Sequence, residues 1–399
     1  MKRCIIITGG YHTNLGSQAM LYHVVSNVAE RFPDREIVLF VPDYESYERK
    51  GLGNFHFRVL PWKLNMKYAC LGSFPYGFLA FLGCAWRKDR RQSLGRVRAV
   101  LGRADMAFDV GGFALSSQWQ YISSLKYLMH IAVMAKYGVA TYLLPQSFGP
   151  FHYNPLAKMI LFPLMRKYLP YPQRIFARED AGLRDIQKFT RDNLRHRADT
   201  VLLSQEIDVG RIYKSPPEFR TRKMEIPVNS VAIIPNIKVM ENTDQDRLLA
   251  VYRQIISYLL ETGRSVFVFP HSAIDRRTCE SLRKHIAAHP GLVFQDFELD
   301  SLEIVQFLSR FEIVLPARYH ALVHAYKAGT PALVFGWSAK YREMMSLLGQ
   351  ERYLFDVRED IETESILAAL NILLARRQDE AQVIKEKLGN LQKEYDVFS

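Results

Sequence analysis

The chain has 399 residues, which is long for one ordinary domain and sufficient for two at roughly 100–200 residues each. Its composition, 48% hydrophobic and 24% charged residues, excludes a disordered protein, a collagen-like fibre and a small disulfide-bonded scaffold. The 53 Lys and Arg residues outnumber the 41 Asp and Glu residues, and the net charge of +12 favours anionic partners: nucleic acid, a phospholipid surface, or phosphorylated and carboxylated small molecules.

The cysteines and the N-terminus indicate where the protein resides. The 4 cysteines lie far apart, and none has a Cys or His neighbour at the spacing of zinc ligands. They indicate a reducing compartment, and we expect no bound metal. The apolar run Cys4–Thr8 is too short for a signal peptide, so we expect a cytoplasmic protein.

One uncharged segment, Ala69–Trp86, is flanked by basic residues on both sides. It just reaches the length of a transmembrane helix, but Gly72, Ser73, Pro75 and Gly77 would break such a helix. A buried helical hairpin is the favoured interpretation. Peripheral contact with the inner face of a membrane and a true membrane span stay open as alternatives.

The first half of the chain alternates short β-branched runs with longer amphipathic runs, a pattern typical of βαβ units. We expect strands at Cys4–Thr8, Glu36–Val41, His56–Leu60, Met106–Val110, Ala140–Leu144 and Arg174–Phe176. We expect helices at Gln18–Arg31, Gln120–Lys136, Asn154–Tyr168 and Ala181–Lys188. A proline-containing, charged stretch without periodicity follows at Lys214–Asn229 and is the best candidate for a linker.

The second half repeats the same alternation. We expect strands at Ser230–Pro235, Ser265–Pro270, Leu292–Phe294, Ile313–Pro316 and Ala332–Phe335. We expect helices at Asp244–Glu261, Arg276–His289, Leu302–Arg310, Tyr319–Ala328 and Lys340–Leu348. The predicted organisation is therefore an N-terminal domain at 1–213, a linker at 214–229, a C-terminal domain at 230–360 and a helical tail at 361–399. The expected fold class is α/β, with two Rossmann-like doubly wound domains facing each other across a cleft.

Several loops that follow strands carry polar side chains, and ligands bind at such loops in this fold class. Asn14 follows the first strand and either caps the next helix or presents its amide to a ligand. Gln146 and Ser147, between two prolines, form either a structural turn or an acceptor site. Arg178 leaves a strand directly and is suited to binding a carboxylate or phosphate, and His271 occupies a similar position.

The strongest signal is the strand-to-helix junction around Arg318, Tyr319 and His320. Cationic side chains in the first turn of a helix oppose its dipole, so a sequence that accepts them is expected to bind an anion there. Lys340 opens the next helix after a strand. Together with Arg178, these residues predict a site for a small polyanion that requires no metal.

Motifs along nearly the whole chain resemble the polysaccharide pyruvyl transferase family. They are, in order, G-G-Y-H-T-N-L-G-S-Q-A, D-V-G-G, P-Q-S-F-G-P, F-A-R-E-D-A-G-L, A-D-T-V, A-R-Y-H-A-L-V-H-A-Y-K-A-G-T-P-A and W-S-A-K-Y. The resemblance implies a fold like that of the GT-B glycosyltransferases. It also implies transfer of pyruvate from phosphoenolpyruvate to two hydroxyls of one sugar, in a polysaccharide or a lipid-linked oligosaccharide, with release of phosphate.

By this resemblance, Arg178, Arg318 and His320 contact the donor, and Asn14 and Lys340 belong to the same active site. The domain at 1–213, which includes the apolar segment 69–86, is the expected acceptor side, and the domain at 230–360 holds the expected donor anion site. The family pattern has an acidic residue where this chain has Ser17, which argues against an acidic acceptor contact there. His320 is the expected general acid, since imidazole titrates near neutral pH. Phosphoenolpyruvate is a co-substrate, and no cofactor is expected.

The fold and the charge also suggest two other functions. A GT-B glycosyltransferase using a nucleotide sugar is the main alternative, although no Glu near 318–340 is placed to contact a ribose. A nucleic-acid-binding protein is not expected, because the basic residues are spread along the chain and form no single stripe.

Overall fold

The strands expected from the short apolar runs form the centres of two α/β units. The computed structural model describes residues 3–11, 14–49, 51–72, 88–295, 299–359 and 362–393. The first unit comprises Met1–His12, Met20–Thr200 and Glu206–Pro217, and the second comprises Thr13–Ala19, Val201–Gln205 and Glu218–Ser399. The helices expected as a separate tail at 361–399 thus fall in the second unit. The boundaries expected at 213 and 230 stay predictions.

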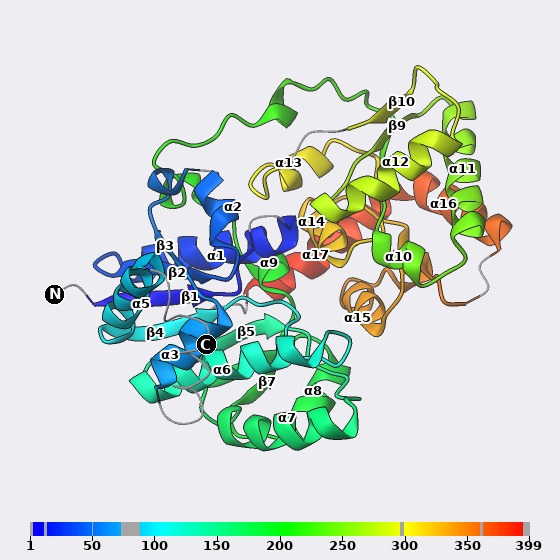
Figure 1. The fold of residues 1–399 in the computed structure, drawn as a ribbon. Coiled ribbons are helices and arrows are strands. Elements are labelled where there is room, and N and C mark those ends of the chain that lie inside the picture. Colours follow the sequence, from blue (N-terminus) through cyan, green and yellow to red (C-terminus); the bar gives the residue numbers. More distant parts are fainter. Residues whose placement is uncertain are drawn as a thin grey trace. The chain divides into compact units, whose positions relative to one another are not determined.

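The first unit is built on a seven-stranded parallel sheet (Figure 1). Its strands, side by side in this order, are β3 (Arg58–Pro61), β2 (Glu36–Val41), β1 (Cys4–Thr8), β4 (Ala104–Asp109), β5 (Ala140–Gln146), β6 (Arg174–Ala177) and β7 (Leu194–His196). β1 pairs with β2 on one side and with β4 on the other, so the direction of strand addition reverses beside β1. Ligands of open α/β sheets bind outside the carboxyl ends of the strands at such a reversal.

All residues of β1 are buried, as expected for a parallel strand covered by helices on both faces. The α-helices that the described residues of this part of the chain form are α1 (Leu15–Arg31), α2 (Tyr44–Arg49), α3 (Leu64–Leu71), α5 (Lys88–Leu101), α6 (Tyr121–Tyr137), α7 (Pro155–Tyr168) and α8 (Asp180–Ile186). α3 packs on α5 and α6, and α6 packs on α7. α6 contributes Leu128, Ile131 and Val133, among other residues, to a hydrophobic core of this unit.

Two glycines allow the loops after β1 and β4 to approach each other closely. Gly9 has a φ of +84°, and a Cβ built on it would lie 2.5 Å from the backbone nitrogen of Gly111. A side chain at Gly9 would be both strained and obstructed. The glycines of the T-G-G and D-V-G-G segments therefore bring the ends of β1 and β4 together.

The second unit contains a four-stranded parallel sheet. Its strands, side by side in this order, are β10 (Leu292–Phe294), β9 (Ser265–Val268), β8 (Ser230–Ile234) and β11 (Ile313–Pro316). Ala332 forms an isolated parallel bridge with Val314 of β11, and the chain then continues into β12 (Val334–Gly336), which pairs with β13 (Leu354–Asp356). The strand expected at Ala332–Phe335 is therefore shared between two neighbours.

Most helices of the second unit connect one of its strands to the next. They are α9 (Thr200–Leu203, whose first residue is assigned to the first unit), α10 (Ile237–Glu241), α11 (Gln245–Glu261), α12 (Arg276–His285), α13 (Ile304–Leu308), α14 (Tyr319–Lys327), α15 (Ala339–Leu347), α16 (Thr363–Ala375) and α17 (Arg377–Lys393). Asp244 caps α11 by accepting a hydrogen bond from the backbone N–H of Arg247 at 3.1 Å. Such a cap stabilises a helix by about 1 kcal/mol.

The expected apolar segment Ala69–Trp86 is described only at its beginning. Ala69–Leu71 form the last turn of α3, which Gly72 ends in the left-handed conformation with a φ of 66°. Residues 73–87 lie outside the described part of the chain, and so does the expected hairpin. Among the described helices, none combines the length and the apolar character needed to cross a membrane.

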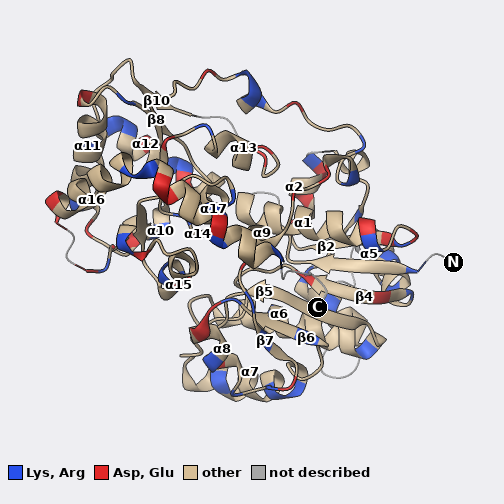
Figure 2. Ribbon diagram, turned by 180° about the vertical axis from the view of Figure 1, so that it is seen from behind, with Lys and Arg blue, Asp and Glu red and all other residues tan. Residues whose placement is uncertain are grey.

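Charged residues of both signs are interspersed along the helices of each unit (Figure 2). In the first unit, the last turn of α7 carries Arg166 and Lys167. In the second unit, the last turn of α12 carries Arg283, Lys284 and His285. Cations at these positions are favourable because the C-terminal end of a helix carries a partial negative charge.

Candidate functional site

The strand-to-helix junction that gave the strongest sequence signal is present in the second unit. β11 ends at Pro316, and α14 begins at Tyr319 with Arg318 as its N-cap residue in an extended conformation. The first turn of α14 contains no acidic residue, so no carboxylate of the helix offsets the positive end of its dipole. The junction therefore has the electrostatic character of an anion site.

Arg318 is held in a fixed orientation by Asp275. Its Nε donates to Oδ2 of Asp275 at 2.6 Å, and its Nη2 donates to Oδ1 at 2.8 Å. The Asp275 side chain is completely buried, and its Oδ1 also accepts from the backbone N–H of Ile237 at 3.1 Å. The pair uses two of the five N–H groups of the guanidinium and restricts the direction of the others.

His271 lies in the same unit and is buried close to other basic side chains. Its Nε2 is 3.0 Å from Nδ1 of His324, and both rings are buried. Burial lowers the pKa of His271 well below its ordinary value, and His324, His320 and Arg318 lower it further by charge repulsion. His271 is therefore neutral at physiological pH and acts as a hydrogen-bond partner of His324, which the sequence analysis had not selected.

His320 contacts the beginning of the first helix. Gly16 and His320 both belong to the second unit, and a Cβ built on Gly16 would lie 2.2 Å from Cγ of His320. The imidazole thus occupies the space that a side chain at position 16 would need. This contact gives the glycine of the T-N-L-G-S segment a definite steric role.

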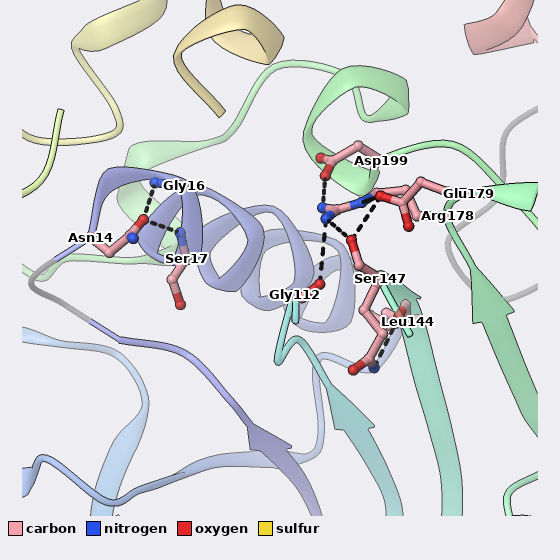
Figure 3. Close-up of polar contacts among 10 residues, drawn as sticks. Asn14, Gly16, Ser17, Gly112, Leu144, Ser147, Arg178, Glu179 and Asp199 are labelled. Atoms are coloured by element: carbon pink, nitrogen blue, oxygen red, sulfur yellow. Dashed lines mark hydrogen bonds and ion pairs between the residues drawn. The ribbon is translucent and has the colours of Figure 1, made fainter. Parts of the chain in front are cut away.

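Asn14 caps α1, which is one of its two expected roles. Its Oδ1 accepts from the backbone N–H groups of Gly16 at 3.0 Å and Ser17 at 3.2 Å (Figure 3). Its backbone forms an antiparallel bridge with Ser272. Gln18 forms a further hydrogen bond within the second unit, in which its Oε1 accepts from the backbone N–H of Ser301 at 2.7 Å.

Lys340 lies in the first turn of α15, close to an aromatic cluster. Its ammonium is 5.0 Å from the ring centroid of Trp337, 5.6 Å from that of Tyr319 and 5.7 Å from that of Tyr341. These distances are in the range of cation–π interactions. The second unit thus brings together the predicted residues Asn14, His271, Arg318, Tyr319, His320 and Lys340.

Arg178 belongs to the first unit and is enclosed by two carboxylates. It donates from Nε to Glu179 at 3.0 Å and from Nη1 to Asp199 at 2.6 Å (Figure 3). Its Nη2 donates to Ser147 Oγ at 2.6 Å and to the backbone oxygen of Gly112 at 3.4 Å. The side chain is only 3% exposed, so the network neutralises a buried charge.

Gln146 and Ser147 are both buried members of hydrogen-bond networks. Gln146 Nε2 donates to Asp109 at 3.2 Å, and its Oε1 accepts from the Tyr127 hydroxyl at 3.0 Å. The Ser147 hydroxyl donates to Glu179 at 2.7 Å. The structure thus places Gln146, Ser147 and Arg178 together at the ends of β5 and β6.

Two of the partners, Asp275 and Asp199, were not predicted from the sequence, and neither was Asp109 itself. Asp109 is the last residue of β4 and is 3% exposed. Burial raises its pKa, although hydrogen bonds from Thr8, Gly111 and Gln146 oppose this effect. Its position before two glycines at a strand end is the signal that could have identified it.

Comparisons with known proteins agree with this architecture. The sequence profile of the family described as polysaccharide pyruvyl transferase matches residues 14–339. No curated protein matches the chain. Among solved structures, the UDP-GlcNAc 2-epimerase from Methanocaldococcus jannaschii is similar with a TM-score of 0.55 and 12% identity, over 94% of this chain and 93% of that one.

A spinosyn rhamnosyltransferase solved with thymidine diphosphate is similar with a TM-score of 0.54 and 13% identity, over 98% of this chain and 96% of that one. At such low identity the likeness concerns the fold alone, and it confirms the expected GT-B-like α/β class. The family profile covers both the N-terminal loop that carries Asn14 and the junction that carries Arg318. The chain belongs to the polysaccharide pyruvyl transferase family.

Proposed function

We propose that the protein transfers the enolpyruvyl group of phosphoenolpyruvate to two hydroxyls of one sugar, in a polysaccharide or a lipid-linked oligosaccharide. The product is a cyclic pyruvate ketal, and inorganic phosphate is released. The observation that carries the proposal is Arg318, held by Asp275 at the N-terminus of α14 in a member of this family. A fixed guanidinium at the positive end of a helix is suited to the phosphate or carboxylate of this donor.

His320 is the proposed general acid. Protonation of the methylene carbon of the donor makes the adjacent carbon electrophilic, and a sugar hydroxyl adds to that carbon as it loses its proton. The C–O bond to phosphate then breaks, and a neighbouring hydroxyl of the same sugar closes the ketal with loss of its proton. Phosphoenolpyruvate and a diol thus give a ketal and phosphate, with no oxidant or reductant required.

The cationic side chains have separate roles in this proposal. Arg318 binds the donor and stabilises the charge on the departing phosphate. Tyr319 and Lys340 lie beside each other in the second unit and complete the donor site. Arg178 is a proposed donor contact as well, acting from a network in which Glu179 and Asp199 already bind its guanidinium.

The test compares donors directly. The protein is incubated with glycans and lipid-linked oligosaccharides of its own organism, together with phosphoenolpyruvate or a panel of nucleotide sugars. Release of phosphate from phosphoenolpyruvate supports the proposal. Release of a nucleoside diphosphate would instead favour the alternative, a GT-B glycosyltransferase.

Replacement of His320 examines the acid. His320→Gln is expected to abolish turnover while largely preserving phosphoenolpyruvate binding. His285→Gln is the matched control, because His285 is exposed in the last turn of α12 in the same unit. A His320→Gln variant that turns over as fast as His285→Gln would remove His320 from this role.

A further inference from the structure

A cavity of about 800 Å³ opens at the carboxyl edge of the sheet of the first unit. Its lining includes Thr8 at the end of β1 and Asp109 at the end of β4. These two strands are neighbours at the point where the direction of strand addition reverses. This is the position at which open α/β sheets bind ligands, and the volume is in the range of small-molecule sites. All the described residues that line the cavity belong to the first unit.

The floor of the cavity is a hydrogen-bond chain with a defined direction. Trp62 Nε1 donates to His130 Nδ1 at 3.3 Å, which places the proton of the neutral imidazole on Nε2. This Nε2 lies 3.3 Å from the Thr8 hydroxyl, and that hydroxyl donates to Asp109 Oδ2 at 2.6 Å. Burial lowers the pKa of His130 well below its ordinary value, so the ring stays neutral. The chain thus fixes the Asp109 carboxyl group at the base of the cavity.

Aromatic side chains form a second part of the lining. The Trp119 indole is 42% exposed, and its Nε1 donates to the backbone oxygen of Phe113 at 3.0 Å. The Trp119 and Phe113 rings meet edge to face, with centroids 5.7 Å apart. Such a fixed, exposed indole offers a flat apolar surface, which suits the C–H face of a pyranose ring while the polar floor suits its hydroxyls.

Amines form the third part of the lining. Lys63, Lys67 and Lys126 all line the cavity, whereas Asp109 is the only acidic residue among the described residues that line it. Lys67 is buried and donates to the backbone oxygen of Lys126 at 2.9 Å. Burial lowers the pKa of Lys67 to about 7. The side chain of Lys126 is exposed to solvent. Lys63 is exposed and pairs with Glu45 at 2.8 Å, and such an exposed pair is weak because solvent screens it.

We propose that this cavity binds the acceptor saccharide, and that the saccharide carries an anionic group, a carboxylate or a phosphate, which the lysine side chains bind. The pyranose ring packs on Trp119, and its hydroxyls face the Thr8–Asp109 floor. The role as acceptor rests on the proposed pyruvyl transfer. The binding of an anionic saccharide by the first unit does not.

Three probes with the same ring separate the contributions: glucose, glucuronate and glucose 1-phosphate. Their dissociation constants are measured by calorimetry or ligand-observed NMR with the full chain and without phosphoenolpyruvate. A hydrogen bond between charged groups is stronger than one between neutral groups, so glucuronate or glucose 1-phosphate is expected to bind about tenfold to a hundredfold tighter than glucose. The preferred probe of the two identifies the anion as a carboxylate or a phosphate.

Two exposed lining residues provide variants that do not disturb the core. Lys126→Gln is expected to remove most of the preference for the charged probe, and Trp119→Ala to weaken all three probes. Lys158→Gln on α7 is the matched control, an exposed lysine of the same unit that does not line the cavity. The inference would be overturned if glucose and the charged probes bound equally well. It would also be overturned if the Lys126→Gln variant kept the preference for the charged probe, or if Trp119→Ala left the binding of all three probes unchanged.

Failure of this inference and failure of the proposed function are distinguishable. Phosphoenolpyruvate binding is measured separately, with Arg318→Lys as the variant that disrupts the donor site. If donor binding depends on Arg318 but saccharide binding does not depend on Trp119, the cavity assignment alone is overturned. Saccharide binding without donor binding would leave the cavity assigned and the pyruvyl transfer refuted.

Discussion

Asp275 binds Arg318 through two parallel hydrogen bonds of 2.6 and 2.8 Å, and this pair sets the direction of the guanidinium at the start of α14. The two residues come from different strand-to-helix junctions of the second unit, one before α12 and one before α14. Because a carboxylate offsets one positive charge, the contribution of Arg318 to donor binding depends on geometry as well as on charge.

Asp275→Asn is therefore expected to lower kcat/KM for phosphoenolpyruvate by about tenfold to a hundredfold, because a displaced catalytic group costs up to about that much. The amide oxygen of Asn can still accept from the Ile237 N–H, so the fold is expected to survive. Steady-state kinetics and thermal unfolding check both points. Exposed Asp246→Asn in the first turn of α11 is the control, and equal kinetics of the two variants would contradict the role of Asp275.

Gly16→Ala is expected to displace His320, because the added Cβ would lie 2.2 Å from the imidazole Cγ. Turnover should fall by about a hundredfold, again because of misplacement of a catalytic group, while donor binding falls less. Gly389→Ala in α17 is the matched control, since nothing lies within 4 Å of a Cβ at that position. A Gly16→Ala protein with normal turnover would show that the position of His320 is unimportant.

Arg178→Met is expected to destabilise the first unit even without any ligand. It leaves the buried carboxylates of Glu179 and Asp199 without their cation, and breaking a buried pair in this way costs about 3–5 kcal/mol. Denaturant unfolding of the protein without donor measures this loss. If the stability were unchanged while donor binding disappeared, Arg178 would serve the donor alone.

Lys67 predicts a specific dependence of stability on pH. Burial lowers its pKa from 10.5 to about 7, so between these values the unfolded chain binds the proton more strongly than the folded one. The cost of burying the charged amine is complete below about pH 7 and diminishes as the pH rises toward 10.5.

The variant Lys67→Met isolates this effect. The difference in unfolding free energy between the two proteins is expected to shift in favour of the wild type as the pH rises above about 7. Denaturant unfolding at several pH values measures the shift, and Lys126→Met, an exposed lysine, is the control. A difference independent of pH would contradict the depressed pKa.

The strands and the strand-to-helix junction at Arg318 could be predicted because both depend on local sequence. The run Cys4–Thr8 is apolar and β-branched, and β1 has these bounds. Arg318 and His320 follow a strand directly, and the chain forms a helix there. The helix α5 was missed because its sequence is highly charged and contains Gly95, so it lacks a clear apolar face.

The partners that lie far away in the sequence could not be predicted, because tertiary packing determines them. Nothing local connects Arg318 to Asp275, or Gly16 to His320. The burial of Gln146 follows from its place as the last residue of β5, where its side chain meets Asp109 and Tyr127. The cavity was missed because its lining comes from segments spread between Thr8 and His130, and no single motif marks it.

The most direct test of the central claim is mass spectrometry of the acceptor glycan after incubation with phosphoenolpyruvate labelled in its pyruvyl carbons, with phosphate measured in parallel. The account predicts one labelled pyruvate ketal in the glycan for each phosphate released, and neither product with the Arg318→Lys variant. Transfer of a sugar from a nucleotide sugar to the same glycan, with no incorporation of the labelled carbons, would contradict it.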